Sequence, residues 1–296
     1  MREKNPVAIV GIGLMGEVFA KRLLDAGIAV VGYDVDPARR ARLDELGGRS
    51  VASIADLARE PSRCILLAVF NTDQVEDVVE NHLLPALGDG SGRIVMCMST
   101  CDPDRIEALG GRVIPRGIRF LDSPVSGTSE QVRQGDGVGL IGGEVAAADE
   151  VKDVLAALFA RCFPVGKVGD GGRAKLAVNL ILGLNRLALA EGLVFAERMG
   201  LDPAAFLKVA RGSASYSQVM DTKGDKMVRG DFAPEGRAKQ TLKDAKLMLA
   251  QGEAIGQRLV SLQVHADVLD ACVQAGEGDL DNSVIIQEVR RRSVKG

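Results

Sequence analysis

Lys175 and Asn179 form the pair of side chains best suited to acid–base chemistry in this sequence. They lie four positions apart in a helical stretch, so they share one helix face that is otherwise apolar. Apolar surroundings disfavour an ammonium ion and bring a lysine pKa toward the range in which it exchanges protons with a substrate. The spacing is equally compatible with a lysine near a helix start whose charged end reaches solvent.

A glycine-rich turn near the N-terminus indicates the binding of a dinucleotide. The apolar run 7–10 leads into this turn, and Asp34 ends the next apolar run, about 20 residues on, where a carboxylate can bind the adenosine ribose. The first glycine allows the tight bend, the second lets a pyrophosphate approach, and the third lets the next helix pack closely. A glycine-rich turn in another kind of α/β domain is the structural alternative. The turn residues are Gly11, Ile12, Gly13, Leu14, Met15 and Gly16.

The charge of Asp34 predicts the choice of cofactor. A carboxylate at this position repels the additional phosphate of NADP, so we expect NAD to be preferred. Arg39 and Arg40 begin the following helical segment and could soften that preference, which leaves NADP as a second possibility.

Polar segments follow three apolar runs of the first half. Because ligands bind at the carboxyl ends of strands in a doubly wound sheet, these segments are candidate binding sites. Each is also composed of residues that are common in ordinary turns. The run 64–69 continues into Phe70 and Asn71, the run 94–98 into Ser99 and Thr100, and the run 118–121 into Asp122, Ser123, Pro124, Val125, Ser126, Gly127 and Thr128.

The order of the elements predicts two domains. Apolar runs at about 7–10, 29–33, 64–69, 94–98, 118–121 and 138–141 alternate with helical patterns at about 14–26, 37–46, 53–59, 74–80 and 103–109. This alternation is typical of a doubly wound parallel sheet, so we expect an α/β Rossmann domain over residues 1–168. After the glycine-rich segment 166–172 only helical patterns remain, at about 173–199, 203–211, 239–256 and 259–275. We therefore expect an all-helical domain over residues 169–296, built around the long apolar helix.

Composition excludes several functional classes. The net charge of −3 over 296 residues provides no general attraction to nucleic acid or to an anionic membrane. The two histidines have no partner at metal-ligand spacing, and the five cysteines lack a CxxC pair and suit reduced thiols. Polar residues such as Arg186 and Glu191 interrupt the most apolar helix and argue against a membrane span. Residues 1–6 lead directly into the first run without room for a signal peptide, so we expect a cytoplasmic, metal-free protein.

Four motifs, in this order, resemble the β-hydroxyacid dehydrogenase family. That family includes 3-hydroxyisobutyrate dehydrogenase and 2-hydroxy-3-oxopropionate reductase and is related to 6-phosphogluconate dehydrogenase. The matching motifs are the glycine turn, residues 122–127, the segment from Lys175 to Asn179, and the pair Lys243-Asp244, which by itself could be a solvated surface pair. The resemblance extends from the first strand to about residue 287 and is more specific than any one motif.

The resemblance implies a site and an assembly. Lys175 would be the general acid/base, Ser126 and Gly127 would hold a substrate carboxylate beside Thr128, and Asn179 would hydrogen-bond the substrate. Ser99 and Thr100 would lie near the nicotinamide and its ribose. With Phe70, Asn71, Lys243 and Asp244 they complete the expected cofactor site. The expected assembly is a homodimer or homotetramer around the long helix, and the expected partner is a small carboxylate substrate.

Three departures from the family pattern concern the substrate rather than the reaction. Thr128 stands where the family has a second glycine, Gly135-Asp136-Gly137 replaces a glycine-threonine-leucine segment, and Gly236 replaces an aromatic residue. They favour a larger or more polar substrate. An imine reductase of the same fold and a catalytically silent dinucleotide-binding module are the alternative functions. Lys175 together with the carboxylate site at Ser126-Gly127 speaks against the first, and Lys175 with Asn179 speaks against the second.

Overall fold

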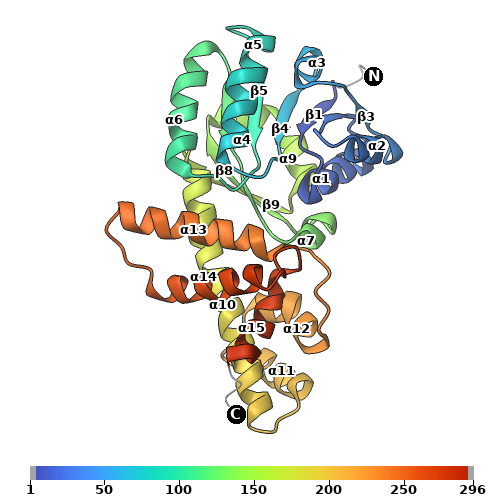
Figure 1. Ribbon diagram of the computed structural model, residues 1–296. Coiled ribbons are helices and arrows are strands. Elements are labelled where there is room, and N and C mark those ends of the chain that lie inside the picture. Colours follow the sequence, from blue (N-terminus) through green and yellow to red (C-terminus); the bar gives the residue numbers. More distant parts are fainter. Residues whose placement is uncertain (1–4, 293–296) are drawn as a thin grey trace. The chain divides into compact units, whose positions relative to one another are not determined.

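The structure is a computed structural model that describes residues 5–292, in two compact units that divide between Lys175 and Leu176 (Figure 1). Residues 1–4, which bear on the expected absence of a signal peptide, lie outside the described residues. The first unit is α/β and the second is helical, which confirms the predicted fold class. The division falls inside a helix, a few residues beyond the predicted boundary at 168/169.

A nine-stranded sheet forms the centre of the first unit. Its strands are β1 (Val7–Val10), β2 (Val30–Tyr33), β3 (Arg49–Ser50), β4 (Cys64–Leu67), β5 (Ile94–Cys97), β6 (Arg119–Asp122), β7 (Val125–Ser126), β8 (Val138–Gly143) and β9 (Arg161–Gly166). The strand order is β3-β2-β1-β4-β5-β6-β8-β7, with β9 paired to β8. The strands from β3 to β6 are parallel, in the order of a dinucleotide-binding sheet, and β8 is antiparallel to β6.

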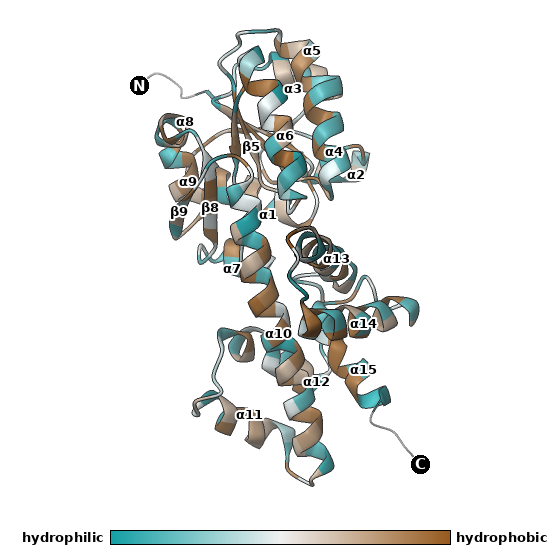
Figure 2. Cartoon of the chain, turned by 90° about the vertical axis from the view of Figure 1, so that its left-hand side faces the viewer, coloured by the Kyte–Doolittle hydropathy of each residue, from teal (hydrophilic) through white to brown (hydrophobic). Residues whose placement is uncertain are grey.

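Both faces of the sheet are covered by helices because alternate strand residues point to opposite sides. In β1, Val7 and Ile9 belong to one core and Ala8 and Val10 to the other. The first core is covered by α1 (Leu14–Asp25), α2 (Pro37–Glu45), α7 (Ser129–Arg133), α8 (Val145–Glu150) and α9 (Lys152–Leu158). The second is covered by α3 (Ile54–Arg59), α4 (Thr72–Asp77), η1 (Val78–Leu83), α5 (Leu84–Leu87) and α6 (Pro103–Val113). Figure 2 shows hydrophobic strands between helices whose outer sides are hydrophilic.

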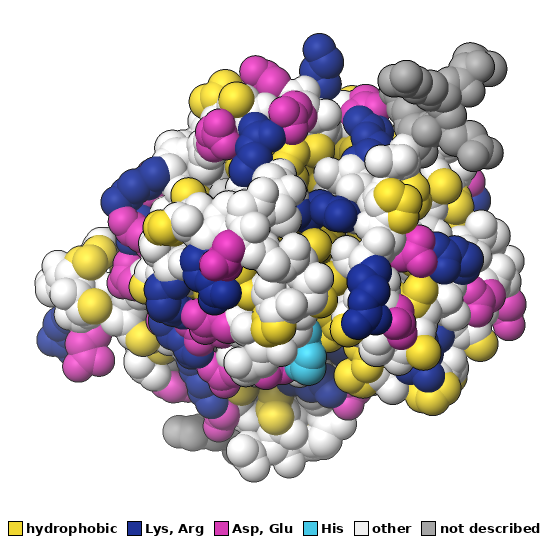
Figure 3. Space-filling model, turned by 90° about the horizontal axis from the view of Figure 1, so that it is seen from above, with side chains coloured by type: hydrophobic (Ala, Val, Ile, Leu, Met, Phe, Trp, Pro, Cys, Tyr) yellow, Lys and Arg dark blue, Asp and Glu magenta, His cyan; other side chains and the backbone are white. Residues whose placement is uncertain are grey.

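The surface of the molecule seen from above carries both signs of charge. Figure 3 shows lysine and arginine side chains interspersed with aspartate and glutamate over this face. Many such groups pair across helices in the first unit, as Arg112 Nε does with Glu80 at 2.6 Å. Pairs this exposed contribute little to stability and serve mainly to keep the surface solvated.

The second unit is helical throughout. It contains most of α10 (Asp170–Arg198), then α11 (Pro203–Arg211), η3 (Met220–Gly224), α12 (Asp225–Arg229), α13 (Ala238–Ala254), α14 (Val260–Gln274), η4 (Asn282–Val284) and α15 (Ile285–Arg292). Its core joins α10 through Leu187 and Leu193 to α14 through Leu269 and to α15 through Ile286. Among residues 5–292, α10 alone is long and apolar enough to cross a membrane. This is weak evidence for a span, because the core helix of a soluble protein meets the same criteria.

One buried carboxylate fastens three segments of the helical unit. Asp281 is fully buried, and its Oδ2 accepts hydrogen bonds from Lys223 Nζ at 2.9 Å, Glu235 N at 3.0 Å and Gly236 N at 3.1 Å. Its Oδ1 accepts from Ser283 N at 3.1 Å and from Ser283 Oγ at 2.8 Å. Lys223 is 1% exposed, so this is an ion pair removed from solvent with nearly all its hydrogen-bonding capacity used.

Candidate active site

The turn between β1 and α1 can be built only with glycine at two of its positions. Gly11 has φ +93°, and a Cβ there would lie 2.6 Å from Ala68 O. A Cβ on Gly16 would lie 1.9 Å from Gly11 O, so α1 packs against the turn itself. A Cβ on Gly13 would meet only Arg39 Nη1, at 3.5 Å. Gly13 is therefore the place where the backbone stays open to a phosphate.

The first turn of α1 fits a pyrophosphate. Gly13 is the N-cap of α1, and no side chain caps this end. The first amide groups of the helix are thus left for a ligand, and the helix dipole favours an anion there. Leu14 is 39% exposed, Met15 is half-buried, and Ile12 is buried below the turn.

Asp34 holds the glycine turn against the end of β2. Its side chain is 4% exposed; Oδ2 accepts a hydrogen bond from Ile12 N at 2.7 Å and Oδ1 accepts from Asp36 N at 2.9 Å. Each oxygen retains a lone pair for a ribose hydroxyl. Arg39 Nη1 lies 3.5 Å from Oδ2 on a half-exposed side chain. Asp34, which we predicted to bind the ribose, therefore also holds the glycine turn in place.

Phe70 and Asn71 follow β4 as predicted, and Asn71 is the N-cap of α4. Asn71 Oδ1 accepts a hydrogen bond from Gln74 N at 2.9 Å and so caps α4. Phe70 is 46% exposed, and its amide donates to Gln74 Oε1 at 2.8 Å. The ring of Phe70 is the part of this segment that is open to a ligand.

Ser99 links the ends of two neighbouring strands. Its Oγ donates to Val69 O at 2.7 Å, which joins the segment after β5 to the segment after β4. Thr100 follows it and is half-buried. Because β1, β4 and β5 are adjacent and parallel, Ser99 and Thr100 lie at the same sheet edge as the glycine turn.

The segment after β6 forms a small hairpin and a capped helix. Ser126 lies in β7 opposite Val138 of β8, and Gly127 has φ +144°, which favours glycine. Thr128 is the N-cap of α7: its Oγ accepts from Gln131 N at 3.1 Å, and its amide donates to Gln131 Oε1 at 2.9 Å. The hydroxyl expected to alter the substrate pocket is therefore also used in a capping box.

Asp122 anchors the start of α10, a role that the sequence analysis missed. It is 1% exposed, and its Oδ2 accepts a hydrogen bond from Gly172 N at 2.7 Å. A Cβ on Gly171 would lie 2.3 Å from Asp122 O, so only glycine allows this contact. Gly171 and Gly172, which suggested a turn in the sequence, thus belong to the helix. The helix begins at Asp170 rather than near Arg173. Burial raises the pKa of Asp122 to about 6, although the amides of Gly172 and Gly169 lower it.

Lys175 lies one turn into α10 and is 7% exposed, so its amine is not directed into solvent as the structural alternative required. Asn179 follows one turn later, and its Nδ2 donates to Asp244 Oδ2 at 3.1 Å. Lys243 Nζ lies 3.2 Å from Asp244 Oδ1, with side chains only 19% and 11% exposed. Lys243-Asp244 is therefore not a solvated surface pair; Asp244 orients the amide of Asn179.

Two further polar residues extend this network within the helical unit. Asn282 is 7% exposed and its Nδ2 donates to Thr241 Oγ1 at 3.0 Å, three positions before Asp244 on α13. No spacing or motif in the sequence points to either residue. They are brought together only by the packing of η4 on α13.

Comparison with known proteins agrees with this architecture. Residues 6–166 match the family described as the NAD binding domain of 6-phosphogluconate dehydrogenase, and residues 169–289 match the NAD-binding domain of NADP-dependent 3-hydroxyisobutyrate dehydrogenase. The chain is thus an NAD(P)-binding oxidoreductase. It belongs to the β-hydroxyacid dehydrogenase family, as its motifs indicated.

Individual relatives differ in the substrates that their names record. L-threonate dehydrogenase of Cupriavidus necator is 30% identical over 95% of both chains. The crystal structure of a 3-hydroxyisobutyrate dehydrogenase from Salmonella typhimurium has a TM-score of 0.86 and 26% identity, covering 96% of this chain and 99% of that one. An imine reductase from Pseudomonas sp. has a TM-score of 0.67 at 21% identity, covering 96% and 99%, and shares the fold alone.

Proposed function

We propose that this protein interconverts a small β-hydroxy acid and the corresponding semialdehyde or keto acid with NAD(P). The observation that carries the proposal is a buried lysine followed, one turn along the same helix, by an asparagine whose amide a carboxylate orients. A bound nicotinamide supplies the hydride chemistry, for which the glycine turn and Asp34 provide the binding groups.

The residues of the chain supply proton transfer and orientation. In oxidation, Lys175 Nζ accepts the proton of the substrate hydroxyl; in reduction, it donates a proton to the developing alkoxide. Asn179 gives one amide hydrogen to Asp244, which fixes its orientation and leaves the second amide hydrogen to donate to the reacting oxygen of the substrate. The Ser126 hydroxyl and the Gly127 amide are the proposed donors to the substrate carboxylate.

Replacing the lysine tests this mechanism. Lys175→Ala should lower turnover of β-hydroxy acids by about 10² to 10⁴, the usual contribution of a general acid/base, while cofactor affinity stays near that of wild type. Reduced nicotinamide is followed by absorbance with NAD and with NADP, and Lys246→Ala, at an exposed lysine of α13, is the control. Retained turnover would remove Lys175 from the mechanism. Turnover of a cyclic imine but of no hydroxy acid would contradict the proposed reaction.

We propose NAD as the preferred cofactor because Asp34 repels a 2′-phosphate. The half-exposed Arg39, 3.5 Å from that carboxylate, is the group that could accommodate NADP. A clear preference for NADP in the initial rates would contradict the argument from Asp34.

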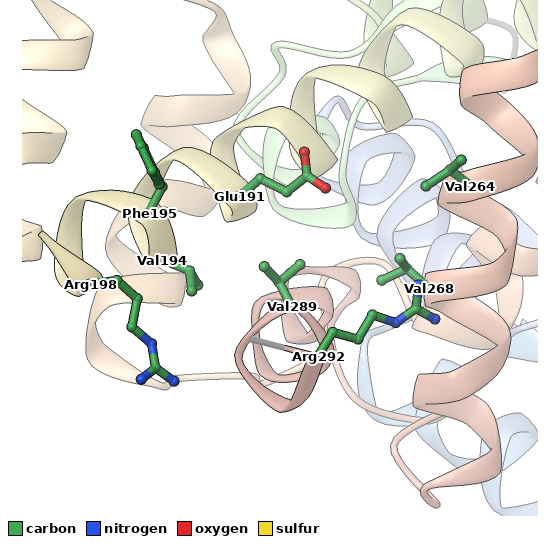
Figure 4. A pocket seen from close by; sticks show the side chains of 8 residues that line it. All are labelled: Glu191, Val194, Phe195, Arg198, Val264, Val268, Val289 and Arg292. Atoms are coloured by element: carbon green, nitrogen blue, oxygen red, sulfur yellow. The ribbon is translucent and has the colours of Figure 1, made fainter. Parts of the chain in front are cut away.

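We also propose that α10 contributes to a homodimer or homotetramer. Only 33% of its most apolar stretch is buried within the chain, and Ile181, Phe195 and Met199 are 57–66% exposed. Figure 4 shows Phe195 at a pocket of about 260 Å³ between α10, α14 and α15, which contains none of the predicted site residues. A second copy would cover this apolar surface. Phe195→Glu should therefore reduce the molar mass measured by light scattering; an unchanged mass would contradict this role for Phe195.

A further inference from the structure

We infer that Asn282, held by Thr241, is a recognition site for a hydroxyl group on the carbon beyond the reacting one. The inference rests on the proposed function and defines its substrate class as hydroxylated β-hydroxy acids. Its basis is a buried amide carbonyl that has no hydrogen-bond donor, next to the residues that orient Asn179.

The hydrogen bonds determine which end of the Asn282 amide is free. Thr241 Oγ1 donates its only hydrogen to Arg237 O at 3.2 Å, so toward Asn282 it can only accept. The group 3.0 Å from Thr241 Oγ1 must then be the NH₂ of Asn282. The backbone is fixed as well, since Asn282 N donates to Gly236 O at 2.7 Å. The remaining end of the amide is the acceptor Oδ1.

Asn282 Oδ1 lacks a donor although it is removed from solvent. Asn282 is 93% buried, and Oδ1 has no hydrogen-bond partner among the described residues. A buried carbonyl in this state is unfavourable, which is why nearly all such groups are paired with protein, water or ligand. No described residue supplies the donor, and we assign it to a bound substrate.

Gly236 leaves space beside this amide. A Cβ at position 236 would lie 3.3 Å from Asn282 Nδ2, closer than most such contacts. Larger side chains would occupy the space beside the amide. Two lysines balance the two carboxylates nearby: Lys223 Nζ contacts Asp281 at 2.9 Å and Glu235 at 3.0 Å, and Lys226 Nζ lies 3.3 Å from Glu235. Gly236 N also donates to Asp281, so the surroundings offer no net negative charge that would select an ammonium group. A neutral hydroxyl is the donor that suits this site.

A series of hydrogen-bonded side chains relates Asn282 to the proposed reaction centre. Asp244 binds Asn179, and Thr241 lies three positions before Asp244, on the same face of α13. Asn282 is the next group in this series, bound to Thr241. We therefore place a hydroxyl bound by Asn282 on a carbon next to the one that Lys175 and Asn179 handle.

A pair of substrates that differ in one hydroxyl tests the inference. With 3,4-dihydroxybutyrate and 3-hydroxybutyrate, wild type should favour the dihydroxy acid in kcat/KM by about tenfold or more, because the deoxy acid leaves Oδ1 unpaired. Asn282→Ala should bring the ratio to within about twofold of unity, and Gly236→Ala should lower it by crowding the amide. Asn81→Ala, at an exposed asparagine bonded to Asp77, is the matched control and should leave activity and ratio unchanged.

The outcomes separate the inference from the proposed function. Equal kcat/KM values in wild type, or a preference that survives in Asn282→Ala, would overturn the inference while the dehydrogenase function stands. If wild type oxidises neither acid nor any other β-hydroxy acid, the proposed function fails and the inference fails with it. If Asn282→Ala does not fold, the melting temperature of wild type with cofactor decides: 3,4-dihydroxybutyrate must raise it more than 3-hydroxybutyrate.

Discussion

Buried polar side chains are satisfied differently in the two units. In the Rossmann unit, Asp34 and Asp122 accept backbone amide hydrogens at strand ends and helix starts. In the helical unit, Arg186 is 8% exposed, and its Nε and Nη1 have no hydrogen-bond partner among residues 5–292; the same holds for both ring nitrogens of the fully buried His265. Strand ends and helix starts leave amide hydrogens free for carboxylates, and the loop amides around Asp281 do the same in the helical unit. Helix interiors use both their amides and their carbonyls, so Arg186 and His265, which are packed between helices, need another side chain or a ligand.

The Arg186 and His265 pair is built into the packing of α10. A Cβ on Gly183 would lie 2.7 Å from His265 Cε1, so a glycine in mid-helix makes room for the imidazole. Gly183 and Arg186 are three positions apart and share a helix face. Burial lowers the pKa of Arg186 to about 10, and burial together with Arg186 lowers that of His265 to about 4, so the histidine is neutral at pH 7.

The strongest test of this contrast removes Lys223, a buried cation of the helical unit that is paired with two carboxylates. Lys223→Met should lower the free energy of unfolding by about 3–5 kcal/mol, because it leaves the carboxylate of Asp281 buried without its counter-ion. Urea unfolding followed by circular dichroism measures the loss. Lys246→Met, at a lysine that is 65% exposed, should change it by less than about 0.5 kcal/mol. A similar small loss for Lys223→Met would show that the pair does not need its cation.

The second test concerns the Rossmann unit and depends on pH. The pKa of Asp122 rises from 3.8 to about 6 on folding, so between these values the folded state binds more protons and its stability falls as pH rises. Above pH 6 the free energy of unfolding has fallen by the full amount, on the order of 3 kcal/mol. Asp122→Asn keeps an acceptor for Gly172 N, so relative to wild type it should gain stability between pH 4 and pH 7. A difference that is constant over this range would show that the Asp122 carboxyl is not strained by burial.

The third test has the smallest expected effect, and it predicts a gain in stability rather than a loss. Arg186→Met should raise the free energy of unfolding by about 1–3 kcal/mol, since an apolar side chain replaces a buried guanidinium whose Nε and Nη1 have no hydrogen-bond partner in the described part of the chain. The same urea measurement applies. A loss of stability instead would reveal that water, an anion or another subunit satisfies Arg186, and the contrast between the units would then disappear.

The sequence predicted the parts of the molecule that are contiguous along the chain. The parallel sheet, the helix expected at 37–46 and the glycine turn all follow from local chemistry; that helix begins at Pro37, directly after its N-cap Asp36. The strands β3, β7 and β9 were not predicted. β3 and β7 have two residues each, too few to show an alternation, and β9 is largely exposed and does not alternate between buried and exposed residues. The start of α10 was placed three residues late, since the pattern of Gly171 and Gly172 could not show that Asp122, about fifty positions away, accepts an amide of the first turn.

Residues of the helical unit were harder to predict. Arg186 was an interruption in an apolar helix and His265 a histidine without a ligand pattern; that both are buried depends on the packing of α14 against α10. Asn282 and Thr241 likewise meet only in the folded chain, 41 positions apart. Spacing along a sequence reports neighbours on one helix, whereas these pairs are neighbours between helices.

The carboxylate of Asp281 also bears on the order in which the helical unit folds. It joins Glu235, 46 positions earlier, and Lys223, 58 positions earlier, so its hydrogen bonds close the longest loops of that cluster. Loop closure costs entropy, and burying the Asp281 carboxylate without a counter-ion is unfavourable. Lys223 Nζ also lies 3.0 Å from Glu235 Oε2, within the segment from η3 to Gly236. We therefore expect this segment to form part of its contacts alone and to complete them only when Asp281 docks.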